Sequence, residues 1–185
     1  SDEQKQNIRV KGYLFTRKTS EKPGSNQWFT SSSAAKRDLK VTPDWDNEGT
    51  MPKDALEKAV TALKNSNADL KYIIYLTDGE PNTIKADGKN IKVYPISIHD
   101  APDTNWGGNS GTYMEQVAEA AKQGGMSCGG VYSGVTADEI KQVFQQITGS
   151  IVTEIEQLGS GMTNVVISDE LSEYAEFVSA DLTEQ

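Results

Sequence analysis

The sequence has very few of the residues that build disulfide frameworks, zinc sites and catalytic dyads. One cysteine, Cys128, and one histidine, His99, occur in 185 residues. A single cysteine forms no internal disulfide, so cysteine usage says nothing about the redox compartment. With no second histidine or cysteine near His99, a zinc site is not expected. For Cys128, a nucleophilic thiol and a small buried side chain beside Gly129 stay open as alternatives.

Long apolar runs and an excess of basic residues are also missing. No stretch approaches the length of a membrane span, and no charged-then-apolar signal peptide opens the chain. Lys and Arg number 18 against 27 Asp and Glu, for a net charge of −9. This balance argues against nucleic acid, anionic membranes and direct membrane insertion, because such partners select clustered basic residues. It suits a surface protein or a cation binder, although many cytosolic proteins are as acidic.

Apolar runs and amphipathic segments alternate along the chain. Strands are predicted where apolar residues run continuously or alternate, and helices where they recur at helical spacing. Thr136 with Glu139 forms a capping box ahead of the last helix, and Gly124-Gly125 marks the end of the one before. The expected strands are 8–17, 27–31, 71–77, 91–99 and 129–134, the helices are 52–63, 113–121 and 136–151, and the loops are 18–26, 42–52 and 100–111.

This order predicts an α/β fold with a doubly wound, mostly parallel sheet flanked by helices. Ligands of such sheets bind beyond the carboxyl ends of the strands. The run "YIIYLTDGEPN" reaches that point at Asp78, where a carboxylate is placed for chemistry rather than packing. The alternative is that Asp78 only shapes its turn, because Asp-Gly is a common turn pair.

Several stretches together resemble the von Willebrand factor A domain. "YIIYLTDGEPN" looks like the fourth strand and metal loop of that family, and "DNEGTMPKDALEKAV" like the loop and helix that carry its metal-binding threonine. "IKVYPISI" is similar to its fifth strand. "GGVYSGVTADEIKQVFQQI" is similar to its last strand and last helix. The resemblance covers about residues 8–155 and implies the Rossmann-like sheet of the family.

The resemblance implies a divalent cation, usually Mg²⁺, at the top of the sheet, with Mn²⁺ or Ca²⁺ as substitutes. Hydroxyl and carboxylate oxygens suit a small hard cation that keeps several waters. By resemblance, Thr50 is the direct hydroxyl ligand. Asp78 is the carboxylate that acts through water. One coordination position stays open for a carboxylate of the partner protein.

The family's Asp-x-Ser-x-Ser run is absent from this sequence, and so are the strand and helix that should precede "NIRVKGYLF". That strand is central in the family's sheet, so its loss leaves unpaired backbone edges. Three explanations stay open. The missing piece is supplied by another polypeptide, the chain is cut or rearranged, or residues 163–174 ("TNVVISDELSEY") take its place.

We expect two parts, an A-like domain over 1–158 that is incomplete at its N-terminus, and a β-rich linker or start of a neighbouring β domain over 159–185. The tail resembles the segment that follows the A domain in Gram-positive surface proteins and pilus adhesins, which often carry isopeptide cross-links. An ordinary C-terminal hairpin on the same domain is the alternative.

The expected function is adhesion or protein binding rather than catalysis. The sequence has no phosphate-binding Gly-Lys-Ser/Thr loop and no Gly-x-Ser-x-Gly elbow. Glu80, Asn82 and Trp106 are the expected partner contacts, although Trp106 could equally cover the edge of the core. The resemblance implies a cell-wall-anchored bacterial surface, and an extracellular matrix protein or pilus subunit as ligand. The alternatives are a structural pilus or surface-shaft scaffold with a degenerate metal site, and an enzyme on a related fold.

Overall fold

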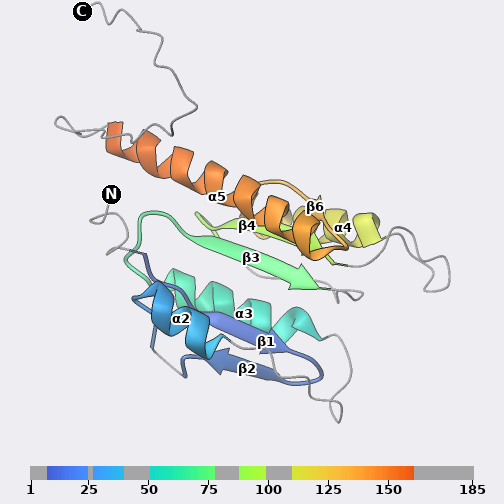
Figure 1. The fold of residues 1–185 in the computed structure, drawn as a ribbon, viewed down its shortest axis with the longest axis horizontal. Coiled ribbons are helices and arrows are strands. Elements are labelled where there is room, and N and C mark those ends of the chain that lie inside the picture. The colour runs from blue at the N-terminus through green and yellow to red at the C-terminus, as the bar shows by residue number, and fades with distance from the viewer. Residues whose placement is uncertain (1–7, 25–26, 40–50, 78–87, 99–109, 161–185) are drawn as a thin grey trace, which may run out of the picture.

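The structure is a computed structural model that describes residues 8–24, 27–39, 51–77, 88–98 and 110–160. In these ranges the strands come in consecutive pairs, and one or two helices follow each pair (Figure 1). In chain order the elements are β1 (Gly12–Phe15), β2 (Thr19–Lys22), α2 (Ser32–Asp38), α3 (Pro52–Lys64), β3 (Tyr72–Thr77), β4 (Lys92–Ser97), α4 (Ser110–Gln123), β5 (Ser127–Cys128), β6 (Tyr132–Ser133) and α5 (Ala137–Ser160).

The larger of two sheets has four strands, and all three of its pairings are parallel. β3 and β4 pair along their whole length, from Tyr72 opposite Lys92 to Thr77 opposite Ser97. On the other side of β4, β5 pairs with its first residues and β6 with its last. The smaller sheet is the antiparallel hairpin of β1 and β2. The fold is therefore mixed α/β, with a mostly parallel sheet flanked by helices.

Local signals in the sequence explain where the helices begin and end. Pro52 opens α3, where its fixed φ suits the first turn. At α5 the capping box is confirmed, because Thr136 Oγ1 accepts from the Glu139 amide at 3.2 Å and Glu139 Oε2 accepts from the Thr136 amide at 2.9 Å. α4 ends at Gln123, and the turn that follows contains Gly125, whose φ of 79° favours glycine. Within the described ranges, no helix is long and apolar enough to cross a bilayer.

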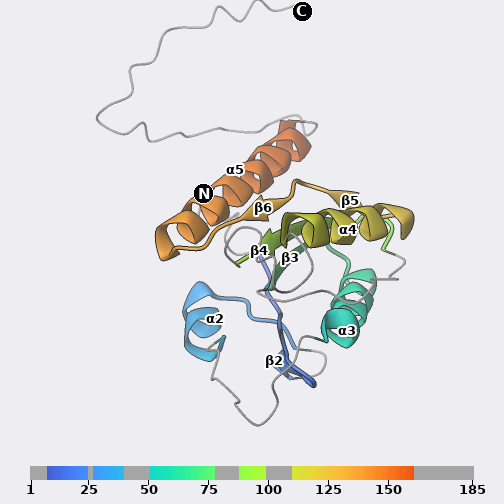
Figure 2. The same ribbon diagram turned by 90° about the vertical axis from the view of Figure 1, so that its right-hand side faces the viewer.

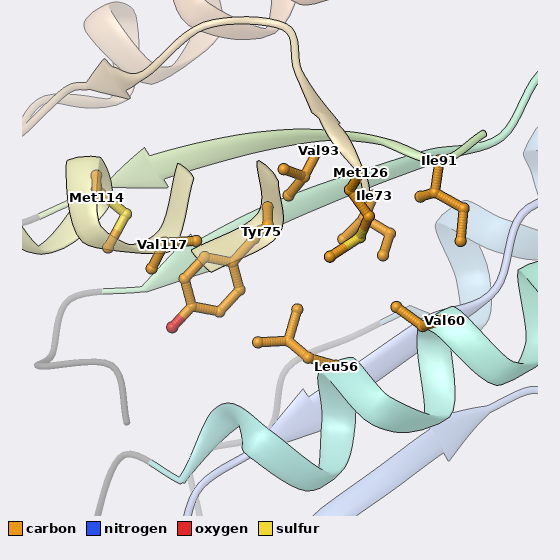
Figure 3. Packing of buried hydrophobic residues seen from close by; sticks show 10 residues of the cluster. Leu56, Val60, Ile73, Tyr75, Ile91, Val93, Met114, Val117 and Met126 are labelled. Carbon is orange, nitrogen blue, oxygen red and sulfur yellow. The ribbon is translucent and has the colours of Figure 1, made fainter. Parts of the chain in front are cut away.

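One face of the parallel sheet packs against α3 and α4. Side chains of both helices interdigitate with those of β3 and β4 (Figure 3). The ring of Phe15 in β1 stacks on Tyr75 with centroids 5.8 Å apart. This cluster therefore joins the β1–β2 hairpin to the larger sheet. Its buried members are Leu56, Val60, Ile73, Tyr75, Ile91, Val93, Met114, Val117, Ala121 and Met126.

The opposite face packs against α5, and the contact is centred on β4. Tyr94 and Ile96 of β4 are buried beneath Val143 and Ile147 of α5. Figure 2 shows α3 and α4 on one side of the sheet and α5 on the other. On the α5 side β3 is less covered, since its Ile74 remains exposed.

Several expectations about the first forty residues were wrong. Residues 18–26 were expected to be a loop, but they contain β2, which the hairpin partner β1 holds in register despite its polar sequence. The strand expected at 27–31 is reduced to one bridge between Val10 and Phe29. The short helix α2 was not predicted. Its start is fixed by Ser31, whose side chain accepts from the Ala34 amide.

The middle of the chain follows the expected order, with shifted boundaries. β3 and β4 lie inside the predicted strands 71–77 and 91–99. α4 begins at Ser110, inside the predicted loop 100–111. β5 was missed, because only 129–134 was expected to be extended there. α5 continues to Ser160, past the predicted end of that helix at residue 151.

Candidate functional site

The carboxyl ends of the parallel strands form one edge, which we call the carboxyl edge. It is defined by Thr77 of β3, Ser97 of β4 and Ser133 of β6. The strand register places Thr77 opposite Ser97, and Ser97 opposite Ser133. Three neighbouring strands therefore end on hydroxyl side chains at the same level.

Thr77 and Ser97 are the two buried polar residues of the described core, at 5 % and 2 % exposure. Along β3, Thr77 shares a face with Ile73 and Tyr75, because side chains alternate along a strand. Along β4, Ser97 shares a face with Val93 for the same reason. Both hydroxyls thus lie on the face that α3 and α4 cover, side by side on adjacent strands.

Backbone hydrogen bonds fix the chain where it leaves this edge. The Ile98 amide donates to the Thr77 carbonyl at 3.0 Å, and the Gly134 amide donates to the Ser97 carbonyl at 2.9 Å. The entry to α3 is tied as well, because the Met51 amide donates to the Thr16 carbonyl, just past the end of β1, at 2.9 Å. The segments that follow these points therefore start from fixed positions.

Three helices begin at the carboxyl edge. Figure 1 shows the first turns of α3, α4 and α5 at the end of the molecule where the arrow of β3 points. The amino end of a helix carries a partial positive charge, so the edge favours carboxylates and other anions. This field would lower the cost of bringing a partner's carboxylate to a cation there.

Two of the described carboxylates near these helix starts have partners within the chain. Asp54 pairs with Lys58 at 2.9 Å, and the hydrogen bond from Lys58 holds the pKa of Asp54 below its usual range. Hydrogen bonds from the Thr136 and Val135 amides lower the pKa of Glu139 in the same way. Across the described ranges, no three His, Cys, Asp or Glu side chains gather as a cation site. Of the described residues, the edge contributes hydroxyls and helix amides.

The predicted site residues Thr50, Asp78, Glu80, Asn82 and Trp106 all lie outside the described residues. The metal and partner contacts assigned to them stay predictions. The structure does place two of their neighbours in the chain, Thr77 and Met51. Thr77 ends β3 directly before Asp78, and Met51, which follows Thr50, is bonded to Thr16.

Sequence reasoning missed Ser97 and Ser133. A usable signal was present, since both are hydroxyl residues near the carboxyl end of a predicted strand, as Thr77 is. The register that aligns the three could not be read from the sequence, because it depends on which strands pair.

A polar cluster at the opposite, amino end of the sheet anchors α5. Glu154 accepts a hydrogen bond from the Tyr72 hydroxyl at 3.0 Å and forms an ion pair with Lys92. Burial, followed by the hydrogen bond with Glu154, raises the pKa of Tyr72. Burial also raises the pKa of Tyr94, to about 12. These groups connect a helix to two strands and lie far from the carboxyl edge.

We compared the chain with protein-family models, with curated proteins and with solved structures, and none of the three comparisons gives a match.

Proposed function

We propose that this chain is a protein-binding module of the von Willebrand factor A type, built on a doubly wound, Rossmann-like sheet. It acts in adhesion at a cell surface and not as an enzyme. The proposal rests on the sequence resemblance, and the arrangement of the described residues supports it. A parallel sheet with helices on both faces holds its ligands beyond its carboxyl edge.

The observation that carries the proposal is the pair of buried hydroxyls at that edge. Thr77 and Ser97 are aligned by the register of β3 and β4, and the next residue after Thr77 is Asp78. A buried hydroxyl directly before a carboxylate, with a second buried hydroxyl beside it on the next strand and helix amino ends around it, suits the support of a hard cation and its waters.

In the proposed site, Thr50 supplies a direct hydroxyl ligand and Asp78 a carboxylate that acts through water. Mg²⁺ is the expected ion, and Mn²⁺ or Ca²⁺ can replace it. A carboxylate of the partner protein completes the coordination, with Glu80, Asn82 and Trp106 as surrounding contacts. The partner is an extracellular matrix protein or a pilus subunit, and the site of action is a bacterial cell wall.

Calorimetric titration with Mg²⁺ and Mn²⁺ tests the site, with intact mass recorded on the same sample. Micromolar binding that is lost in Asp78→Ala supports it. Asp69→Ala is the matched control, because Asp69 is an exposed carboxylate just before the other end of β3. Unchanged cation-dependent binding in Asp78→Ala contradicts the assignment of the site.

The second candidate is a structural scaffold of a pilus or surface shaft whose metal site is degenerate. The missing Asp-x-Ser-x-Ser run favours it, because Thr50 and Asp78 alone leave Mg²⁺ with few charged ligands. No binding at millimolar cation, with the mass matching 185 residues, would support the scaffold. A screen with generic phosphatase and esterase substrates separates both candidates from an enzyme.

A further inference from the structure

The outer edge of β3 has no strand partner within the described residues, where β3 pairs with β4 alone. The Lys92 amide donates to the Lys71 carbonyl and the Ile98 amide donates to the Thr77 carbonyl. Because backbone groups alternate sides along a strand, the odd-numbered residues of β3 face β4. The amides and carbonyls of Tyr72, Ile74 and Leu76 therefore point away from β4.

β1 lies beyond this edge and presents an edge of its own. The Thr16 amide donates to the Lys18 carbonyl across the hairpin, so the even-numbered residues of β1 face β2. The backbone groups of Tyr13 and Phe15 therefore point the other way. Figure 1 shows β1 between β3 and β2, and the stacking of Phe15 on Tyr75 brings β1 close to β3. We call the space between the outer edges of β1 and β3 the open lane.

The open lane borders apolar side chains that remain accessible. Ile74 is 44 % exposed and Leu76 is 37 % exposed, and both lie on the α5 side of β3. Strands of parallel sheets are normally covered on both faces. An apolar parallel strand at an edge is therefore a place where another strand adds.

The sequence outside the described ranges contains one good candidate for that strand. Residues 1–7 are polar, and 40–50, 78–87 and 99–109 connect described elements and are rich in Pro, Gly, Asp and Asn. Residues 161–185 instead include "TNVVIS", with the β-branched run Val165, Val166 and Ile167. β-branched residues favour strands.

The end of α5 brings this segment to the correct end of β3. Glu154 bonds Tyr72 and Lys92, which are the first residues of β3 and β4. Six more residues complete the helix, adding about 9 Å. Residues 161–163 can span about 10 Å, which is the distance needed along the strand direction to return to the level of Tyr72. A strand over 163–168 would then run in the direction of β3.

The handedness of the connection agrees. From β4 the chain crosses through α4 to β5, moving away from β3 with the helix on the α3–α4 face. A connection from β6 through α5 to the far side of β3 would run across the sheet in the opposite direction, and its helix α5 lies on the opposite face. When both the direction across the sheet and the face are reversed, the handedness of the connection is unchanged. Both connections therefore have the same hand, and parallel crossovers are almost always right-handed.

We propose that residues 163–168 add to the outer edge of β3 as a parallel strand that fills the open lane. The chain then supplies from its own C-terminal part the strand that joins its two sheets. This proposal does not depend on the cation site.

Hydrogen exchange on the full chain tests the proposal first. We expect the amides of Ile74 and Leu76 to be protected, like the amide of Ile73, which faces β4. In a chain truncated after Ser160, exchange at Ile74 and Leu76 should accelerate by about tenfold or more, with Ile73 unchanged as the internal control. Val166→Pro in the full chain should act in the same direction, because proline disrupts strand pairing. Val178→Pro, outside the proposed strand, should not.

A cysteine pair gives a readout that does not require the truncated chain to fold. In a Cys128→Ser background, Ile74→Cys with Val165→Cys should form an intramolecular disulfide under mild oxidation, because this register places Val165 opposite Ile74, whereas Ile74→Cys with Ser179→Cys should not. Fast exchange of Ile74 and Leu76 in the full chain would overturn the proposal. Slow exchange that truncation leaves unchanged would overturn it too, as would a concentration-dependent dimer by light scattering, which would make a second copy the occupant.

Discussion

β3 and β4 are neighbours in one parallel sheet, yet their surroundings differ. β4 is buried at five successive positions from Val93 to Ser97, whereas β3 is buried only at every second residue. Ile74 is 44 % exposed, and Tyr94, directly opposite it on β4, is fully buried. The sequence of β3 is the more apolar of the two. Burial here is therefore decided by what covers a strand and not by its composition.

The difference arises on one face of the sheet. α3 and α4 together cover both strands on their side, in the cluster that contains Ile73, Tyr75 and Val93. On the other side, Val143 and Ile147 of α5 lie over β4. One face of the sheet is complete in the described residues, and the other is covered over β4 more than over β3.

The largest expected effect is a difference in stability loss when isoleucine is replaced by alanine in β4 and in β3. Ile96→Ala should lower the free energy of unfolding by about 2 to 5 kcal/mol, because Ile96 is fully buried beneath α5 and leaves a cavity. Ile74→Ala should change it by about 1 kcal/mol or less, since Ile74 is already exposed to water. Urea denaturation measures both. Equal losses would break the comparison and show that β3 is covered in solution.

The sequence predicted the parts of this fold that rest on local patterns. The capping box of Thr136 and Glu139, Pro52 in a first turn and the apolar runs of β3 and β4 are visible in a few adjacent residues. β2 could not be found this way, because the polar sequence of Thr19–Lys22 becomes a strand only by pairing with β1. The uneven cover of β3 and β4 depends on where α5 lies.

The carboxyl edge also has one part that the sequence predicted and one part that depends on strand pairing. That a site should lie beyond the strand ends followed from the predicted sheet, and Thr77 marks that edge. Its alignment with Ser97 and Ser133 needed the strand register. The roles of Thr50 and Asp78 stay predictions.

A second test concerns how tightly the covered side is packed. A Cβ added at Gly129 would lie 2.0 Å from Tyr94 Cε1, and Tyr94 is buried with no space to retreat. Gly129→Ala should therefore destabilise by about 1 to 3 kcal/mol. The control is Gly149→Ala in α5, which meets no atom within 4 Å and should stabilise by about 0.5 to 1 kcal/mol through helix propensity. Thermal denaturation of both variants checks the signs, and a neutral Gly129→Ala would mean that Tyr94 is less confined.

The alkaline stability of the protein tests the burial of Tyr94 directly. Its pKa is raised to about 12, so above pH 10 the unfolded chain loses the phenolic proton while the folded chain keeps it. Stability therefore falls as the pH rises, by about 1 to 2 kcal/mol between pH 9 and pH 11 to 12 from this group. Tyr94→Phe should remove that part of the loss, and an unaltered pH profile in this variant would contradict it.

At neutral pH, replacing Tyr72 by phenylalanine should cost more stability than replacing Tyr94. No described residue accepts a hydrogen bond from the Tyr94 hydroxyl, so Tyr94→Phe should cost little. Tyr72→Phe removes the bond to Glu154 and should cost about 1 kcal/mol. Denaturation at pH 7 measures both, and a larger cost for Tyr94→Phe would show that its hydroxyl has a partner.

The smallest expected effect comes from weakening α5, the helix that covers β4. Thr136 Oγ1 caps the first turn of α5 at the Glu139 amide, and α5 is the helix that buries Tyr94 and Ile96. Thr136→Ala should cost about 1 kcal/mol, and Thr136→Ser, which keeps the oxygen, should cost much less. Hydrogen exchange adds a spatial readout. If α5 protects β4 more than β3, loosening its first turn should speed exchange at Ile96 more than at Ile74. Equal acceleration at the two residues would mean that α5 stabilises the whole sheet and that the contrast between the strands lies elsewhere.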